Sequence, residues 1–181
     1  MKMRKQTLQI NLLILLTVCI PCNPSQAFDI VLQKDTPVQL YFSPKGGCTE
    51  GILKKIAQAR SEILLQAYSF TSVPIYQALL QAHERGVKIA LIADKSERAE
   101  GLTPATILAN AGIPVYWDGK HAIANNRVII IDQRTVITGS FNFNKASEEM
   151  NTENLLILES EKLSEAYRKN WLQHRQHSEP Y

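Results

Sequence analysis

Residues 62–93, EILLQAYSFTSVPIYQALLQAHERGVKIALIA, decide the fold class of this chain. The apolar run over 62–70 predicts a central strand. Ser72 and Pro74 then open a helix with apolar residues at helical spacing, and 87–93 is again a continuous apolar run. A strand, a helix and a strand in this order form the unit of a helix-covered parallel sheet, so the sequence predicts an α/β fold.

The same alternation continues on both sides of this unit. A strand over 38–42 and a helix carrying Ile52 to Ala59 precede it, and a helix between Thr103 and Gly112 follows it. In the second half, short strand-like segments are separated by tight turns, which favours antiparallel hairpin pairing. These segments cover 114–117, 123–132, 135–141 and 154–158. We therefore expect a mixed β-sheet flanked by helices.

The length and composition fit one globular domain. The chain has 181 residues, of which 45% are apolar and 20% are charged. A last helix is expected from about Ser160, and the polar tail over 173–181 is expected to fray from it. Cys48 is the one cysteine beyond the amino-terminal segment, so we expect no intramolecular disulfide and a buried, apolar role for this side chain.

The amino-terminal segment predicts a secretory signal peptide. A basic start is followed by an apolar run over 10–20 and by a small-residue site that ends at Ala27. The run is shorter than the roughly 18 residues of a spanning helix, so cleavage is preferred over a membrane anchor. An acylated cysteine is disfavoured because Val18 and Pro21, which are not small residues, precede Cys19 and Cys22. We expect a signal peptide over 1–27 and one domain over 28–181, exported to the periplasm or the medium with no membrane span after cleavage.

The excess of basic over acidic residues in the chain comes from this predicted signal peptide. The sequence has 20 Lys and Arg residues against 17 Asp and Glu residues. Cleavage after residue 27 removes Lys2, Arg4 and Lys5 and no acidic residue, which leaves equal numbers of both signs. Net charge therefore gives no argument for nucleic-acid binding, which would need a local basic patch.

A second stretch carries polar residues in a fixed pattern within an apolar β-region. Asn125 and Arg127 lie two apart and share one face of the predicted strand, as do Ser140 and Asn142 on the next strand. A guanidinium with neighbouring amide and hydroxyl donors suits a phosphate group. The pattern indicates a phosphate-binding cluster, with turn-capping residues on a solvated sheet face as the other interpretation.

This stretch resembles the signature of the phospholipase D superfamily, H-x-K-x4-D-x6-G-S-x-N. The residues that match its spacing are Arg127, Asp132, Gly139, Ser140 and Asn142. Glu153 stands where the family places a carboxylate after the motif. The motif region, 119–146, and nearly all of 38–172 are similar to the small, secreted, single-motif bacterial endonucleases of that superfamily.

The resemblance implies a phosphodiesterase that needs no metal ion or other cofactor. In that family the motif histidine attacks phosphorus, a second histidine protonates the leaving oxygen, and the motif lysine, serine and asparagine hold the phosphate oxygens. A chain with one motif takes the second from an identical subunit, which implies a homodimer with a shared active site. The residues this assigns are Asn125, Arg127, Asp132 and Glu153 as catalytic positions, and Arg127, Ser140 and Asn142 as phosphate-binding residues.

Two positions depart from the signature. Asn125 stands where the nucleophilic histidine is expected, and a carboxamide is neither basic nor nucleophilic. Arg127 replaces the motif lysine, which keeps the positive charge and offers a planar fork to a phosphate. His121 lies four residues upstream of position 125, about 13 Å along an extended strand, and is expected in a turn or at the surface.

The remaining histidines and aromatic residues have structural interpretations. His83, His174 and His177 have no partner motif near them and are expected at the surface. No Cys/His group shows the spacing of metal ligands, so no metal site is expected. Three aromatic residues near the motif are expected in the core rather than in a base-stacking groove: Trp117, Phe141 and Phe143.

The leading functional hypothesis is a secreted phosphodiesterase of the nonspecific endonuclease type, with DNA or RNA as its substrate and with Asn125 at the nucleophile position. The first alternative is a catalytically silent homologue that binds nucleic acid or another phosphodiester. The second is a phospholipase D that acts on lipid head groups. This last hypothesis is disfavoured because the sequence shows no amphipathic membrane-surface helix and no second motif.

Overall fold

The strand–helix–strand unit predicted from the sequence lies in the middle of the sheet. The computed structural model describes residues 29–98 and 101–181, so the predicted signal peptide lies outside the described residues. The unit consists of β2 (Glu62–Ala67), α2 (Val73–Glu84) and β3 (Lys88–Asp94). β2 and β3 are parallel neighbours, which confirms the prediction from this stretch.

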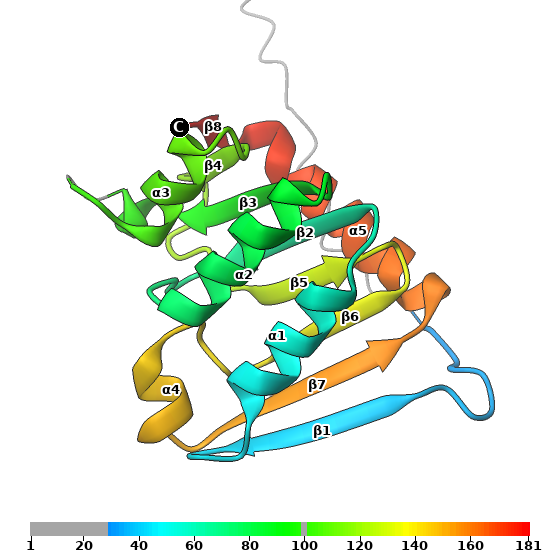
Figure 1. Ribbon diagram of the computed structural model, residues 1–181. Helices are drawn as coiled ribbons and strands as arrows, with labels where there is room; N and C mark the ends of the chain where they lie inside the picture. Colours follow the sequence, from blue (N-terminus) through cyan, green and yellow to red (C-terminus); the bar gives the residue numbers. More distant parts are fainter. Residues whose placement is uncertain (1–28, 99–100) are drawn as a thin grey trace, which may run out of the picture.

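One mixed sheet has the strand order β1-β7-β6-β5-β2-β3-β4-β8 (Figure 1). Its other strands are β1 (Val38–Ser43), β4 (Val115–Asp118), β5 (Arg127–Ile131), β6 (Thr135–Gly139), β7 (Glu153–Glu159) and β8 (Glu179–Pro180). β2, β3 and β4 are parallel, whereas β5, β6 and β7 pair antiparallel along the second half of the chain. The expected mixed sheet flanked by helices is confirmed.

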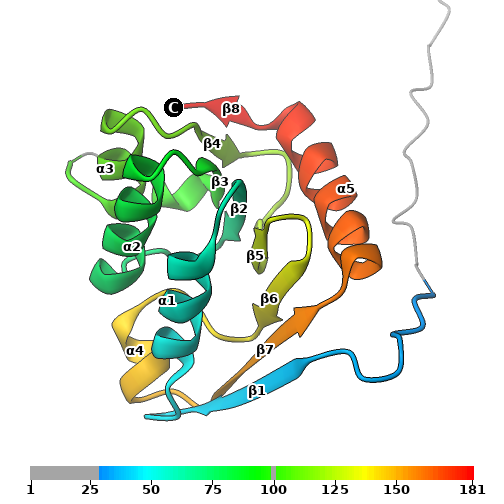
Figure 2. The same ribbon diagram turned by 45° about the vertical axis from the view of Figure 1, so that its right-hand side comes forward.

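Helices cover both faces of this sheet, which gives three layers. α1, α2 and α3 lie on one face and α5 lies on the other, as Figure 2 shows when the sheet is seen closer to edge-on. A short helix, α4, lies near the end of the sheet where β7 begins. The bounds are α1 (Cys48–Gln58), η1 (Lys95–Glu97), α3 (Pro104–Asn110), α4 (Lys145–Glu149) and α5 (Glu161–His177).

Each face of the sheet buries its own apolar cluster. The larger one joins α1, α2 and α3 to the sheet and includes Ile52, Leu79 and Ile129, none of which has any solvent exposure. The smaller one lies under α5, where Trp171 packs against Val128 and Ile130. Burial of a side chain of this size contributes about 1.5–3 kcal/mol, so both layers hold the sheet in place.

The carboxyl terminus is more ordered than the sequence suggested. The polar tail was expected to fray, but α5 continues to His177 and β8 then pairs antiparallel with β4. The backbone N–H of Tyr181 donates to the carbonyl oxygen of Val115 at 2.9 Å. This strand could not be predicted from the sequence, because its stability comes from pairing with β4 rather than from an apolar pattern.

The strand expected over 123–132, the three aromatic residues near the motif and Cys48 are all described by the structure. The strand expected over 123–132 is shorter and begins at Arg127, so the preceding residues form a connection. Trp117, Phe141 and Phe143 are buried, which confirms their core role. Cys48 is fully buried as expected, and burial together with nearby Glu148 raises the pKa of its thiol to about 11.

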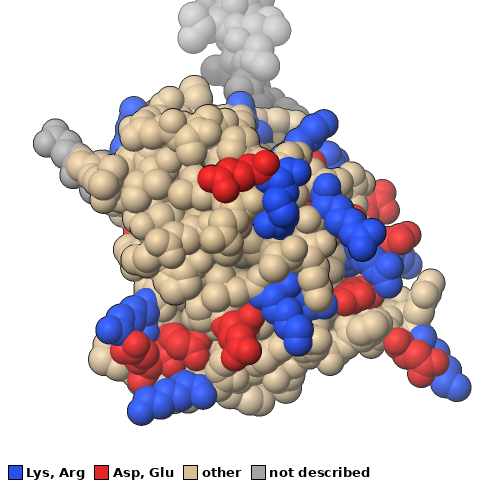
Figure 3. Space-filling view, in the orientation of Figure 1, with Lys and Arg blue, Asp and Glu red and all other residues tan. Residues whose placement is uncertain are grey.

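The surface carries no broad field of one charge on the face covered by α1 and α2. Figure 3 shows Lys and Arg side chains lying beside Asp and Glu side chains there, with wide uncharged areas between them. Among the described residues, no helix is long and apolar enough to cross a membrane.

Candidate functional site

One edge of the sheet gathers the polar residues singled out in the sequence. β1, β2, β3, β4 and β6 run in one direction and end at this edge, whereas β5 and β7 run in the other direction and begin there. Arg127 is the first residue of β5 and Glu153 is the first residue of β7. Ligands in α/β sheets commonly bind outside this edge, so the topology places these side chains where a ligand can approach.

Arg127 is held by the residues on both sides of it. Its Nε–H donates to Oδ1 of Asn142 at 2.6 Å, and one terminal N–H donates to the carbonyl oxygen of Asn125 at 3.2 Å. The guanidinium carbon lies 6.0 Å from the centre of the Tyr68 ring. The guanidinium is therefore oriented before any ligand arrives, with further N–H groups that can serve an anion.

Ser140 lies immediately after β6 and binds the start of β7. Its Oγ accepts hydrogen bonds from the backbone N–H of Asn154 at 3.1 Å and from Nδ2 of Asn154 at 3.3 Å. Because both bonds use the oxygen as acceptor, the hydroxyl proton can be donated to an incoming oxygen. Gly139 permits this close approach, since a Cβ at that position would collide with the backbone oxygen of Asn154.

The chain after Asn142 is fixed to the end of β2. The carbonyl oxygen of Phe143 accepts from the backbone N–H groups of Thr71 and Ser72 at 3.0 and 2.8 Å. Asn144 Nδ2 donates to Ser69 Oγ at 3.1 Å, and Asn144 Oδ1 caps α4. Asn142 therefore lies on a segment held from both sides. Its amide oxygen accepts from Arg127, which leaves its NH2 group as a donor.

Arg127, Ser140 and Asn142, called here the Arg127 site, lie at one edge of the sheet, where Arg127 begins β5 and the other two residues follow β6. Glu153 is at the same edge, where its backbone N–H donates to Ser43 Oγ at 3.1 Å and its carboxylate accepts from Asn151 Nδ2 at 3.2 Å. The site thus combines one fixed cation, hydroxyl and amide donors, and a carboxylate at its margin. Such a donor set suits the oxygens of a phosphate group.

Asn125 is exposed beside the Arg127 site, at the end of the connection from β4 to β5. This connection is held to β3, because Asp94 Oδ2 accepts from the backbone N–H of Ala124 at 2.6 Å. Burial alone would raise the pKa of Asp94, but hydrogen bonds from Ser96 and Ala124 outweigh burial and lower it. Asn125, at the motif's nucleophile position, therefore lies next to Arg127 on a connection that is held to β3, although its side chain is a carboxamide.

Asp132 lies at the opposite end of β5, which separates it from the other predicted site residues. Five residues of strand put it about 16 Å from Arg127. Its carboxylate accepts from the backbone N–H groups of Arg60, Ser61 and Glu62 at 2.8–3.0 Å. Burial alone would raise the pKa of Asp132, but these hydrogen bonds lower it. Asp132 fixes the start of β2 to the end of β5 and does not reach the Arg127 site.

Two histidines differ from the expectation drawn from the sequence. His121 lies in a bend and is exposed, as expected, and its Nδ1 lies 3.2 Å from Asp118. His174 and His177 were expected to have no partner, but both face the same aspartate from α5. The signal was present in the two pairs Asp118-x2-His121 and His174-x2-His177. Sequence alone could not show that the two pairs meet, because they lie far apart in the chain.

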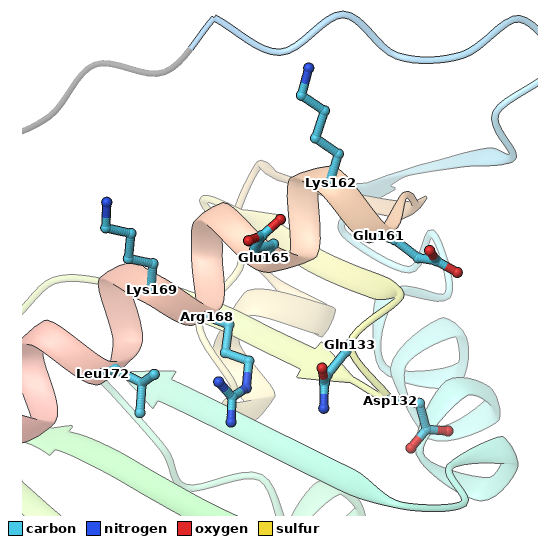
Figure 4. Close-up of a pocket in the computed structure, with 8 residues that line it drawn as sticks. All are labelled: Asp132, Gln133, Glu161, Lys162, Glu165, Arg168, Lys169 and Leu172. Carbon is cyan, nitrogen blue, oxygen red and sulfur yellow. The ribbon is translucent and has the colours of Figure 1, made fainter.

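A groove along α5 is separate from the Arg127 site. It has a volume of about 790 Å³ and is lined by Asp132, Gln133, Glu161, Lys162, Glu165, Arg168, Lys169 and Leu172. Figure 4 shows Lys162 and Lys169 extending away from the sheet, with Glu165 between them and Arg168 directed back toward it. Acidic and basic side chains alternate along its wall, so this groove does not offer a uniform surface to an anion.

Comparison with known proteins agrees with this geometry. A family profile described as "Cardiolipin synthase, PLD-like domain" matches residues 52–175. Phospholipase D of Rickettsia conorii is 42% identical over 135 residues, which cover 75% of this chain and 68% of that protein. The mitochondrial cardiolipin hydrolase of Canis lupus familiaris is 31% identical over 148 residues, with 76% of this chain and 58% of that protein covered.

Solved structures show the same relationship. Nuc from Salmonella typhimurium, a phospholipase D family member, superposes with a TM-score of 0.75 at 35% sequence identity, over 81% of this chain and 99% of that chain. The chain therefore belongs to the phospholipase D-like family, and its fold is the fold of that family.

Proposed function

We propose that this protein acts on the phosphodiester bonds of nucleic acids through the Arg127 site. The observation that carries the proposal is the fixed pair of Arg127 and Asn142, with the Ser140 hydroxyl at the same edge. These groups offer charge-assisted and neutral hydrogen bonds to a phosphate, and such contacts do not depend on the identity of the base. The expected ligand is DNA or RNA of any sequence, in keeping with the resemblance to nonspecific endonucleases.

Position 125 decides whether bound phosphodiesters are cleaved. Cleavage by the family's route needs an imidazole that attacks phosphorus, and the carboxamide of Asn125 has a delocalised nitrogen lone pair that cannot do so. His121 does not replace it, because its ring is directed to Asp118. We therefore propose strong binding with little or no hydrolysis for the chain as it stands, and endonuclease activity once an imidazole is supplied.

A homodimer is part of the same proposal. The chain carries one motif, and β1 presents Val38, Leu40 and Phe42 on the sheet face opposite α1, with exposed fractions of 49%, 54% and 62%. An exposed apolar strip of this kind on an edge strand is typical of a protein–protein contact. A second copy of the chain would cover this strip. Sedimentation showing only monomers at micromolar concentration would contradict the homodimer.

Export is proposed on the sequence of the first 27 residues. A basic start, an apolar run and a small-residue site are the features of a signal peptide. Expression of the full chain in a bacterium, followed by mass spectrometry of the periplasmic fraction, tests the proposal. A mature protein that begins after Ala27 is expected, and an uncleaved cytoplasmic protein would contradict it.

Lipid head groups are the competing substrate, because relatives are named phospholipase D and cardiolipin hydrolase. Both substrates present a phosphodiester, so one assay should compare them. The purified protein is incubated with radiolabelled single-stranded DNA and with vesicles containing cardiolipin, in parallel with the Arg127→Ala variant. The proposal expects DNA retention that depends on Arg127 and falls with salt. Vesicle binding that depends on Arg127, without DNA retention, would assign the site to lipid.

A further inference from the structure

Three imidazoles converge on one buried carboxylate at the end of β4. Asp118 has no solvent exposure. Its Oδ2 lies 2.8 Å from His174 Nδ1, 3.3 Å from His177 Nε2 and 3.2 Å from His121 Nδ1. We call these four residues the Asp118 cluster, and their four nearest nitrogen and oxygen atoms all lie within 4.8 Å of one another.

The cluster is assembled from two separate parts of the chain. Asp118 ends β4 and His121 follows in the connection to β5, whereas His174 and His177 lie on the last turns of α5. A spacing of three residues on a helix places both imidazoles on one face. The pairing of β8 with β4 and the Ser178 Oγ–H bond to the carbonyl oxygen of His174, at 2.8 Å, hold this end of α5 against the sheet.

Two distances within the cluster are compatible with a four-coordinate metal site. Zinc bonds of about 2.0–2.2 Å in a tetrahedron separate neighbouring ligand atoms by about 3.3 Å. Two of the three distances to Asp118 Oδ2 are 3.2 and 3.3 Å. The ring centroids of the three histidines lie 5.0–5.3 Å apart, so one nitrogen of each ring can lie close to the same point.

Several possible donors surround the buried carboxylate of Asp118. Asp118 accepts in addition from the backbone N–H of Lys120 at 3.1 Å, so three imidazoles crowd around a carboxylate that already has a partner. The Asp118 carboxylate is fully buried. A divalent cation bound here would be held by one carboxylate oxygen and by one ring nitrogen of each histidine.

We propose that Asp118, His121, His174 and His177 bind a divalent transition-metal ion, with zinc as the best fit to three nitrogen ligands and one oxygen ligand. Four protein ligands fill a tetrahedral shell, which is the pattern of a structural rather than a catalytic zinc site. This inference does not rest on the proposed function of the Arg127 site. The cluster lies at the same edge of the sheet but three strands away from β5, about 14 Å.

The metal would join α5 to the connection that leads into the motif. His121 and Asn125 lie on this connection, which is also held by Asp94 and by the Nζ of Lys95, a donor to the carbonyl oxygen of His121 at 3.0 Å. The bound ion would add a bond between this connection and the carboxyl-terminal helix. The site is therefore a positioning and stabilising device for the loop that carries position 125.

The test is metal titration of the full protein, purified without a histidine tag and stripped with EDTA. Cobalt(II) absorption in the visible range reports four-coordinate geometry, and zinc competition gives the affinity. His121→Ala and His177→Ala each remove one partly exposed ligand, and His83→Ala is the matched control because His83 on α2 is outside the cluster. Circular dichroism checks that each variant is folded.

One equivalent of zinc is expected to bind to the unchanged protein and to His83→Ala, and at least about 100-fold more weakly to either cluster variant. Zinc should also raise the melting temperature of the first two proteins and leave that of the cluster variants unchanged. Failure of the folded, unchanged protein to bind zinc, or equal binding by His177→Ala, would overturn the proposal. The cluster would then be a hydrogen-bonded histidine group around Asp118.

Discussion

Two sites at one edge of the same sheet offer opposite chemistry. The Arg127 site presents a guanidinium, an amide and a hydroxyl to solvent, all of them donors suited to an anion. The Asp118 cluster gathers a buried carboxylate and three imidazoles, whose oxygen and nitrogen atoms can bind a cation. The imidazole chemistry that the family's reaction needs is absent at position 125 and concentrated three strands away. Three of the four histidines of this chain therefore gather at a different place from the one its motif marks.

The largest expected effect comes from returning an imidazole to the Arg127 site. Asn125→His should raise DNA cleavage by at least about 100-fold over the unchanged protein, because a positioned imidazole supplies the missing nucleophile and proton carrier. Plasmid nicking in EDTA measures it. Asn126→His, one residue away on the other side of the chain, is the control and should remain inactive. Equal activity of the unchanged protein and the variant would show that position 125 takes no part in the chemistry.

Removal of the Arg127 guanidinium should weaken DNA binding without unfolding the protein. Arg127→Ala is expected to lower DNA affinity by about 10- to 100-fold and to reduce the salt slope by about one, because one charge-assisted phosphate contact is lost. Fluorescence anisotropy over a range of salt concentrations measures both. Arg134→Ala changes an exposed arginine at the opposite end of β5 and β6 and should leave affinity unchanged. Equal losses in the two variants would mean that binding is diffuse.

Asp132 should contribute stability and not binding. Asp132→Asn is expected to lower the free energy of unfolding by about 2 kcal/mol, since it weakens the hydrogen bonds to Arg60, Ser61 and Glu62. The pKa of Asp132 is lowered in the fold, so its contribution is present above the unfolded value of about 4 and is lost as pH falls through the folded value. Urea unfolding at pH 7 and at low pH measures the difference, with Glu161→Gln as the exposed control. A specific loss of DNA binding at full stability would contradict the separation of Asp132 from the Arg127 site.

The smallest effect is expected from the cap of α5. Ser160 Oγ accepts from the backbone N–H of Leu163 at 3.3 Å, and Ser160→Ala should cost about 1 kcal/mol of stability. Because α5 carries two ligands of the Asp118 cluster and none of the Arg127 site, DNA affinity should not change. Thermal unfolding and anisotropy on the same samples measure both, with Gln173→Ala on the exposed side of α5 as the control. A loss of DNA affinity would show that the two sites are coupled through the helix.

The fold and the Arg127 site could be predicted because their signals are local. Apolar periodicity predicted the strand–helix–strand order that the structure shows. The shared strand face expected for Asn125 and Arg127 was wrong, because β5 begins at Arg127, and the two residues are joined instead by a hydrogen bond from the guanidinium to the carbonyl oxygen of Asn125. Asp132 came with the motif by resemblance, although five residues of strand already place it far from Arg127. Spacing along a strand is therefore a stronger guide to a site than membership of a motif.

The Asp118 cluster could not be predicted because its residues meet only in the folded chain. Asp118 and His174 are separated by 56 positions, and two short spacings of a common kind do not show that they pair. The polar tail that was expected to fray supplies the strand that holds α5 in place. Polar sequence can be ordered by backbone pairing and by buried charge, and neither leaves an apolar pattern to find.

The most direct test of the central claim is a crystal structure with a short single-stranded oligonucleotide. The account predicts a phosphate within hydrogen-bond distance of the Arg127 guanidinium, the Ser140 hydroxyl and the Asn142 amide, with the side chain of Asn125 beside it and no covalent bond to phosphorus. An oligonucleotide bound in the groove along α5, with the Arg127 site left to water, would contradict it.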